Sequence, residues 1–563
     1  MTGNGSNKKS WLINTPLAKV AAAAVLSILV NGNAAQAAPA MSDAHQNLPE
    51  KLAEPAKAAV EDKTPASLPV NTEVKFDIAN FRLEAPELYL DKVALTKILQ
   101  DGMGKEKTLS QLNHTLDALT SFCRQNGYPA AAAYVPAQES MDGMILIKVI
   151  PGRYGKIKLA NSGQMTENAV HKFTAGLKED SIIKTNALET VLYNLSDING
   201  NRAVGVLSPG EKFGTSDLTI RLEKGKPSST ILYAENYGSQ SSGRYRYGLQ
   251  ENIYNASGNG DKVSVGGLIS NSHMHNYYVN YETLVGHGGT MLGVGYSQMN
   301  YNIAPRDMGI KPDGNAKTVS LFGKYPLYHY ADRSLTFKYG YDYRALEDNL
   351  SQNSSSISSK KHSHSVHAGL DGFNRAADVS VEYGVNILTG ELGIDSEYAN
   401  SLMQNGHVAS HYTKAEANAA VTQRLGHSAD ALIKISGQKA SNNLDSSEEF
   451  YLGGANGVRA YPQGELSGDE GILGTIEARF YTKSGLIPSI YFDAGNVRYN
   501  KDGMKEGSKS YGILKGWGVG LAYNQAGDWF MRLDYARRIG SDPNMSEAAK
   551  AKGRTWFMLG KIW

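Results

Sequence analysis

Close to its C terminus the chain reads Asp528-Trp529-Phe530-Met531-Arg532-Leu533-Asp534-Tyr535. Charged side chains occupy only even-numbered positions of this stretch, and the odd-numbered positions carry tryptophan, methionine, leucine and tyrosine. Successive side chains of a β-strand point to opposite faces, so the pattern predicts a strand with one apolar and one polar face.

The same two-residue period extends over residues 226–563. It recurs in Val379–Ile387 and in Tyr511–Ala522, where apolar residues alternate with polar or small ones. We count about sixteen such segments of roughly ten residues or more, which suits strands that cross a membrane with about 9–11 residues. Strands of soluble sandwiches are usually shorter, at about 5–6 residues. The pattern therefore favours a membrane all-β fold, a 16-stranded antiparallel transmembrane β-barrel, over a soluble β-domain.

The start of the chain has the features of an export signal. Three lysines give a basic beginning, and Val20–Val30 is an apolar run of eleven residues followed by the small-x-small triplet Ala35-Gln36-Ala37. The alternative is an uncleaved membrane anchor, but a spanning helix needs about 20 apolar residues. We therefore expect residues 1–37 to be a signal peptide and the mature chain to begin at Ala38.

Residues 38–72 differ in composition from the rest of the chain. They are rich in alanine, proline, lysine and glutamate and show no strand pattern. This composition predicts a linker that carries one weak helix between Asp43 and Asp62.

Residues 73–225 show one order of elements twice. Each copy is predicted to contain a strand, two helices and two further strands within about 75 residues. The first copy comprises strand 74–78, helices 88–99 and 109–125, and strands 131–135 and 144–150; the second comprises strand 155–160, helices 168–177 and 186–195, and strands 202–207 and 217–223. Two α+β units of β-α-α-β-β order, residues 73–151 and 152–225, are therefore expected before the barrel.

Composition excludes some partners. The formal net charge is +2, from 57 basic and 55 acidic residues, so charge suggests no nucleic-acid partner. Cys123 is the single cysteine, which rules out an internal disulfide and a cysteine-rich metal site. Its place in a helical pattern predicts a small core residue.

The common catalytic and nucleotide-binding motifs are missing from the sequence. It has no Gly-x-x-x-x-Gly-Lys loop, no His-Glu-x-x-His and no Gly-x-Ser-x-Gly. His362, His364 and His367 form the only histidine cluster. Because no fixed set of carboxylates accompanies them, a solvated loop or strand end is favoured over a metal pair. We therefore expect no catalytic residues, no metal, no cofactor and no enzymatic activity.

A glycine-rich segment marks the longest late loop, residues 440–471. It contains Gly457-Val458-Arg459-Ala460-Tyr461, and Arg459 is the only cation between Glu449 and Glu477. This arrangement gives the loop a tight backbone around one arginine and one aromatic ring, that of Tyr461.

Acidic residues are predicted on the inner wall beside this loop. In the strand around residues 490–494 the apolar residues share one face, which turns Asp493 toward the lumen. The same reasoning turns Glu477, Arg479 and Arg532 inward. Arg459 would meet these groups if the loop folded into the barrel.

These segments resemble a known family. Gly457-Val458-Arg459-Ala460-Tyr461 resembles the Val-Arg-Gly-Tyr loop motif of the TpsB transporters of two-partner secretion, also called the hemolysin secretion/activation family. Phe492-Asp493-Ala494-Gly495 resembles the strand motif aromatic-Asp-x-Gly of that family. Gly127-Tyr128-Pro129 with Tyr134-Val135-Pro136 is similar to the end of its first POTRA domain, and Asn236–Ser239 with Gly243–Arg246 to its first barrel hairpin. Ala460 stands where the family usually has glycine, and a positive φ there would be strained.

The resemblance runs from about residue 73 to the C terminus, and it implies a function. Two periplasmic POTRA domains would receive a large exoprotein in unfolded form, and the barrel in the outer-membrane lipid would conduct it to the cell surface. Residues 38–72 would be a linker or a helix that plugs the pore.

The resemblance also implies one contact between the two motifs. Gly457, Val458, Arg459 and Tyr461 of the loop would meet Asp493 and Gly495 of the wall. Because lumen water would screen the ion pair, we expect a coupling of about 1 kcal/mol. The alternative is that Arg459 lies at a solvated loop tip.

Three other functions compete with this interpretation. An outer-membrane protein assembly factor usually has more POTRA units than the two expected here. A diffusion porin would not need a soluble module of about 150 residues, and an outer-membrane enzyme should show a catalytic constellation. The cargo, whether adhesin, cytolysin or contact-dependent toxin, is not encoded in any of these motifs.

Overall fold

The fold is given by a computed structural model, which describes residues 59–62, 75–138, 143–163, 165–199, 203–240, 242–272, 274–302, 311–352, 355–502, 510–525, 528–540 and 552–563. The expected signal peptide, residues 1–37, and most of the expected linker, residues 38–72, lie outside the described residues. In the described ranges, none of the helices has the length and apolar character needed to cross a membrane.

The first α+β unit packs two helices on a small sheet. Its three-stranded sheet has the order β3-β6-β5. Its elements are β2 (Lys75–Ile78), β3 (Asn80–Glu84), α3 (Lys92–Gly102), β4 (Gly104–Thr108), α4 (Leu109–Gln125), β5 (Ala132–Tyr134) and β6 (Met144–Ile150).

The bounds of α3 and α4 follow from their capping residues. Thr108 caps α4, because its side chain accepts from the Gln111 backbone N–H while the Gln111 side chain accepts from that of Thr108. Helix α3 begins later than the predicted residue 88, since Asp91 accepts from the backbone N–H of Val93 and so caps it there. Cys123 lies in the core of this unit, where burial raises the pKa of its thiol to about 11.

The second α+β unit follows directly. Its sheet has the order β1-β8-β9-β7, and its core is built from α5, α6 and this sheet. Its elements are β7 (Arg153–Asn161), α5 (Glu167–Thr174), α6 (Thr185–Asn199), β8 (Ala203–Pro209) and β9 (Thr215–Leu222).

A strand from the linker completes that sheet. β1 (Ala59–Asp62) runs parallel to β8, with Ala59 opposite Val204 and Asp62 opposite Leu207. For these four residues the weak helix predicted between Asp43 and Asp62 is wrong. The edge of β8 offers main-chain N–H and C=O groups, and pairing with them overrides the weak helix preference of an alanine- and glutamate-containing segment.

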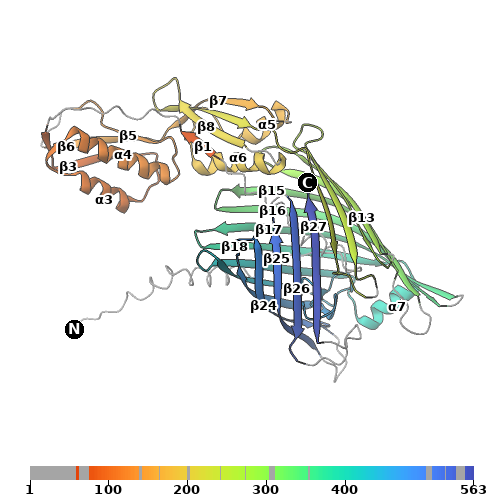
Figure 1. The fold of residues 1–563 in the computed structure, drawn as a ribbon. Helices are drawn as coiled ribbons and strands as arrows, with labels where there is room; N and C mark the ends of the chain where they lie inside the picture. The colour runs from red at the N-terminus through yellow and green to blue at the C-terminus, as the bar shows by residue number, and fades with distance from the viewer. Residues whose placement is uncertain are drawn as a thin grey trace, which may run out of the picture.

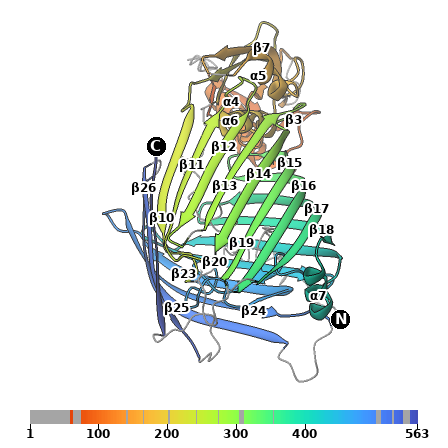
Figure 2. The same ribbon diagram turned by 90° about the vertical axis from the view of Figure 1, so that its right-hand side faces the viewer.

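The second unit is attached to one end of the barrel. The backbone N–H of Thr166 donates to the Gly258 carbonyl at 2.8 Å, and the Asn194 side chain donates to the Gly288 carbonyl at 3.4 Å. Leu284 of the barrel belongs to the same apolar cluster as the core of this unit. Both α+β units therefore lie beyond the same barrel end, and α7 (Glu397–Gly406) lies at the other (Figure 1, Figure 2).

Sixteen antiparallel strands close the barrel, as the alternating pattern predicted. The last strand pairs with the first through Ile231–Glu235 and Met558–Ile562. The strands are β10 (Ser228–Glu235), β11 (Arg246–Tyr254), β12 (Lys262–Ser270), β13 (His275–Leu284), β14 (Met291–Asn302), β15 (Lys311–His329), β16 (Arg333–Gln352), β17 (Ser355–Arg375), β18 (Val379–Ile394), β19 (His411–Arg424), β20 (Ala429–Ala440), β23 (Glu470–Phe480), β24 (Leu486–Arg498), β25 (Tyr511–Asn524), β26 (Trp529–Arg538) and β27 (Gly553–Ile562).

The two faces of the strands have the predicted character. Trp529, Leu533 and Tyr535 of β26 are exposed on the outer face, whereas Asp534 between them is buried on the inner face. An apolar outer surface and a polar interior are what a lipid-embedded barrel requires.

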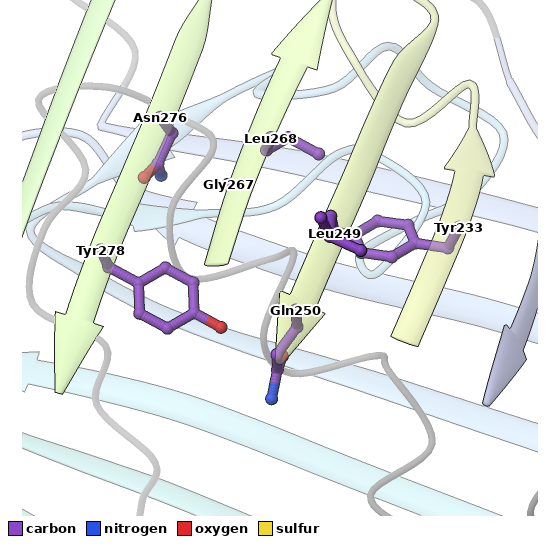
Figure 3. Close-up of a pocket in the computed structure, with 7 residues that line it drawn as sticks. All are labelled: Tyr233, Leu249, Gln250, Gly267, Leu268, Asn276 and Tyr278. Atoms are coloured by element: carbon purple, nitrogen blue, oxygen red, sulfur yellow. The ribbon is translucent and has the colours of Figure 1, made fainter. Parts of the chain in front are cut away.

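A small hollow in the wall of the first strands is lined by seven residues, two of which are tyrosines (Figure 3). Tyr233 lies over Gly248 of the neighbouring strand and Tyr278 lies over Gly266, so a side chain added at either glycine would overlap a ring. These pairs cover the glycine gaps of adjacent strands. The hollow is therefore a packing feature of the wall. Its lining residues are Tyr233, Leu249, Gln250, Gly267, Leu268, Asn276 and Tyr278.

Closure of the sheet predicts resistance to detergent. The protein should fractionate with the outer membrane and migrate faster on gels when it is not boiled, because a barrel without free edges unfolds slowly. Mobility with and without heating is the measurement. Recovery of native protein in the soluble periplasmic fraction would contradict the barrel.

Candidate functional site

The chain between β20 and β23, residues 441–469, turns back into the barrel. Two strands of two residues each, β21 (Phe450–Tyr451) and β22 (Ser467–Gly468), pair with each other. The residues between them form the tip of the loop. Leu452, Val458 and Tyr461 of this tip are buried in one apolar cluster with residues of β24, β25 and β26. The loop is therefore packed against the inner wall.

Glycines set the tight backbone of the tip. The Val458 N–H donates to the Leu452 carbonyl at 2.8 Å, and the Gly457 N–H donates to the Gly454 carbonyl at 3.1 Å. A side chain at Gly457 would overlap the Leu452 carbonyl, and Gly454 has a φ of 130°. This turn carries Arg459 toward the strands of the wall.

Arg459 binds Asp493 through two parallel hydrogen bonds. Its Nε donates to Oδ2 at 2.9 Å and its Nη2 donates to Oδ1 at 2.8 Å, and its backbone N–H reaches Oδ2 at 3.2 Å. Nη1 also lies 3.3 Å from a carboxylate oxygen of both Glu477 and Asp534. This bidentate geometry fixes the orientation of the guanidinium as well as its position.

The remaining contacts of Arg459 complete its surroundings. The guanidinium lies over the Tyr491 ring at 3.2 Å from its centroid, and the Arg459 carbonyl accepts from the Trp556 indole N–H at 2.7 Å. Arg532 shares the acids, with Nη2 at 3.0 Å from Glu477 and 2.7 Å from Asp534. We call Arg459, Asp493, Glu477, Asp534 and Arg532 the tip cluster.

Burial changes the expected strength of this contact. Arg459 is 7% exposed and Asp493 is 0% exposed, so the alternative of a solvated loop tip is wrong. The expected coupling of about 1 kcal/mol rested on screening of the ion pair by lumen water. Breaking a buried ion pair typically costs about 3–5 kcal/mol. The apolar tip residues and the rings of Tyr491 and Trp556 exclude the water that was assumed.

Arg479 is not part of the tip cluster. It lies on the same strand as Glu477, two residues further along, but its guanidinium binds Asp430 of β20 at 2.7 and 2.9 Å. The Tyr481 hydroxyl also donates to Asp430, at 2.5 Å. The structure thus places Arg479 in a separate pair away from the loop.

Ala460 of the loop motif and Gly495 of the strand motif both allow close packing. Ala460 is not among the described residues with positive φ, so it has none of the strain that a left-handed conformation would cause. Gly516 of β25 accommodates it, because a side chain there would come within 2.5 Å of the Ala460 Cβ. At Gly495 a side chain would overlap Leu452, which is why the loop can approach β24 closely.

The histidine cluster lies in the middle of β17, away from the tip cluster, so the predicted loop or strand end is wrong. The ring of His364 contacts the Tyr341 hydroxyl at 2.7 Å, and His362 lies 2.9 Å from Asp395. His367 instead lies 3.3 Å from Asp342. Over the part of the chain that the structure describes, no group of three or more histidine, cysteine or acidic residues is placed to hold a metal ion.

Comparison with known families decides the identity of the chain. The family described as "Haemolysin secretion/activation protein ShlB/FhaC/HecB" matches residues 214–523, which are 310 of the 563 residues. The chain belongs to the haemolysin secretion/activation family. The family described as "POTRA domain, ShlB-type" matches residues 76–152.

Relatives and solved structures agree with the membership. The chain is 28% identical to the heme/hemopexin transporter protein HuxB of Haemophilus influenzae over 83% of this chain and 84% of that protein. It is 22% identical to the outer membrane transporter CdiB of Dickeya dadantii over 68% of each. The structure of CdiB from Escherichia coli has the same fold, with a TM-score of 0.70, 17% identity and coverage of 93% of this chain and 97% of that chain.

Members of this family are transporters. This member is an outer-membrane transporter of a two-partner secretion system, and its POTRA region lies in the periplasm. The tip cluster is then a contact inside the conduit of a secretion transporter.

Proposed function

We propose that the transporter receives its large exoprotein partner in unfolded form on its POTRA sheets and passes it through the barrel when the loop tip leaves the tip cluster. In this proposal residues 73–151 and 152–225 are two POTRA domains and residues 226–563 are the conduit. The chain acts by binding and guiding, without chemistry of its own.

The observation that carries the receiving step is β1. Four residues of the chain's own linker pair with the edge of β8 in parallel register, from Ala59 opposite Val204 to Asp62 opposite Leu207. Main-chain pairing of this kind accepts almost any extended sequence, because the hydrogen bonds come from the backbone. An unfolded exoprotein could replace β1 by the same pairing.

The transport step requires the loop to move. Residues 441–469 pack against the inner wall from β16 to β27, through ion pairs at one side and the tip at the other. A polypeptide crossing the lumen would compete with the loop for this space. The tip cluster is therefore the contact that keeps the loop in one defined position between transport events.

Engineered cysteines offer a direct test of the receiving step. Cys123 is buried, and burial raises the pKa of its thiol to about 11, so a cysteine placed elsewhere would be the reactive thiol of the chain. We expect Ser208→Cys on β8 to form a disulfide with cysteines placed in the N-terminal region of an exoprotein arrested during secretion.

A cysteine on the opposite edge serves as the comparison. Lys158→Cys on β7 lies at the other side of the four-stranded sheet and should trap little or none. Equal trapping at both positions, or none at Ser208→Cys while secretion continues, would refute pairing at β8.

A further inference from the structure

The stem of the long loop, residues 441–449, has a second buried group of ion pairs. Asp445 accepts from Lys361 of β17, with Nζ 2.6 Å from Oδ2. The other carboxylate oxygen of Asp445 accepts from the Ser447 backbone at 3.1 Å and from its hydroxyl at 2.7 Å. The Glu448 N–H closes the turn on the Asp445 carbonyl at 2.8 Å, which sets the direction of the Glu448 side chain.

Glu448 is bound by two cations from different strands. Arg344 of β16 lies 2.8 Å from its Oε1, and Lys414 of β19 lies 3.0 Å from its Oε2. The Glu448 carbonyl accepts from Lys414 at 3.2 Å and from the Gln438 side chain at 2.9 Å. Lys414 also pairs with Glu416, at 2.9 Å.

Three members of this group are as buried as Arg459 and Asp493. Arg344 is 1% exposed, Lys414 is 2% exposed and Glu448 is 3% exposed. Buried ions contribute little net stability in general, because desolvation offsets their attraction, yet removing one partner is costly. Such a group is better suited to fixing a position than to holding the barrel together.

The stem ion pairs and the tip cluster hold the loop on opposite sides of β20 and at different depths in the barrel. β20, from which the loop rises, stands between β16, β17 and β19 on one side and β23, β24 and β26 on the other. Lys414 pairs in register with Ala440 of β20, and Glu477 pairs with Leu432, eight residues further down that strand. The charges are reversed, since the stem offers carboxylates to wall cations and the tip offers a cation to wall carboxylates.

We propose that Asp445 and Glu448 form a stem clasp with Lys361, Arg344 and Lys414 that positions the loop tip, so that Arg459 reaches its depth in the tip cluster only while the stem is held. This inference deepens the proposed function and rests on its moving loop. Asp445 and Glu448 are positioning residues: they contact wall cations and act on transport through the tip.

The test combines single and double variants of the full-length transporter. Glu448→Gln keeps the shape of the side chain and removes its charge, and it should raise the frequency of open-channel events in planar lipid bilayers about tenfold. Because the stem acts through the tip, Glu448→Gln combined with Arg459→Ala should open scarcely more often than Arg459→Ala alone. The matched control is Glu449→Gln, whose carboxylate accepts from the Ser467 hydroxyl at 2.5 Å and lies outside the clasp.

If the Glu448→Gln variant does not insert into the membrane, exchanging the charges of a second ion pair provides another test. Lys361 and Asp445 form a one-to-one pair, so Asp445→Lys alone should open the channel and Asp445→Lys with Lys361→Asp should return it toward the parent frequency. If Asp445 served only to fill space, the double variant should not recover, because it disturbs the packing at least as much as the single variant.

The outcomes separate the clasp from the proposed function. Additive effects of Glu448→Gln and Arg459→Ala, parental opening in Glu448→Gln, or no recovery in the exchanged pair would each overturn the stem clasp. If Arg459→Ala itself opened no more often than the parent, the moving tip of the proposed function would fail instead.

Discussion

Replacement of Arg459 by alanine is expected to reduce exoprotein secretion about tenfold or more while the amount of folded barrel stays unchanged. The substitution leaves Asp493, Glu477 and Asp534 as buried carboxylates with fewer cationic partners. The loop should then no longer return to the one position from which each transport event starts, and secretion falls although the lumen is open more often. Barrel strands pair through their backbones and do not depend on this contact. Secretion is measured from exoprotein in the medium, and the barrel from its heat-dependent mobility.

Matched variants make this result specific. Asp493→Ala should lower secretion similarly, and the double variant should be little worse than either single one, because both remove one contact. Arg459→Lys should recover little, since a lysine cannot make the two parallel hydrogen bonds. Arg479→Ala is the control: it removes an arginine–carboxylate pair of the same wall that does not touch the loop. Full secretion from both alanine variants, or strictly additive losses, would remove the contact from the mechanism.

Alternation along single strands carried much of the prediction. The parity of residues 476–480 and 490–494 was enough to turn Glu477 and Asp493 inward, and the structure buries both there. Period alone could not tell which inward residues of distant strands share one depth. Asp534 shares the parity of Arg532, which was predicted inward, but neither Asp534 nor Trp556 was singled out as a neighbour of Arg459, because both contacts depend on barrel closure and register.

The misplaced elements have the same physical origin. β4 was not predicted because Gly104-Lys105-Glu106-Lys107-Thr108 contains no apolar residue that could show a period. β2 therefore pairs with β4, which the sequence pattern does not reveal. In the three-stranded sheet it is β3, not β2, that pairs with β6. β1 depends on a strand edge about 145 residues away in the chain, which no local propensity encodes.

The burial of the tip was underestimated for a related reason. The sequence shows one arginine in a glycine-rich loop, which suits a solvated tip as well as a packed one. The outcome depends on the apolar cluster of Leu452, Val458, Tyr461 and Tyr491, whose members come from the loop and from a strand that follows it. Only their joint packing removes Arg459 from solvent.

Deletion of residues 73–151 is expected to abolish secretion, with exoprotein in the medium below about one hundredth of the parent amount, if capture needs both POTRA sheets in series. The barrel should still insert, because the second unit makes the contacts with the barrel turns through Thr166 and Asn194. The first unit is joined to the second through the Arg153–Glu87 ion pair and the hydrogen bond from Thr185 N–H to the Gly127 carbonyl. Exoprotein should accumulate in the periplasm, where immunoblotting of cell fractions measures it.

A surface substitution in the same unit provides the control for this deletion. Val93 is 79% exposed on α3, so Val93→Ser should leave secretion at the parental level. The deleted chain must still show heat-dependent mobility, because a misfolded barrel would stop secretion for another reason. Parental secretion by the deleted chain would show that the barrel and the second unit receive the exoprotein without the first POTRA sheet, and a series of two receiving sheets would then be wrong.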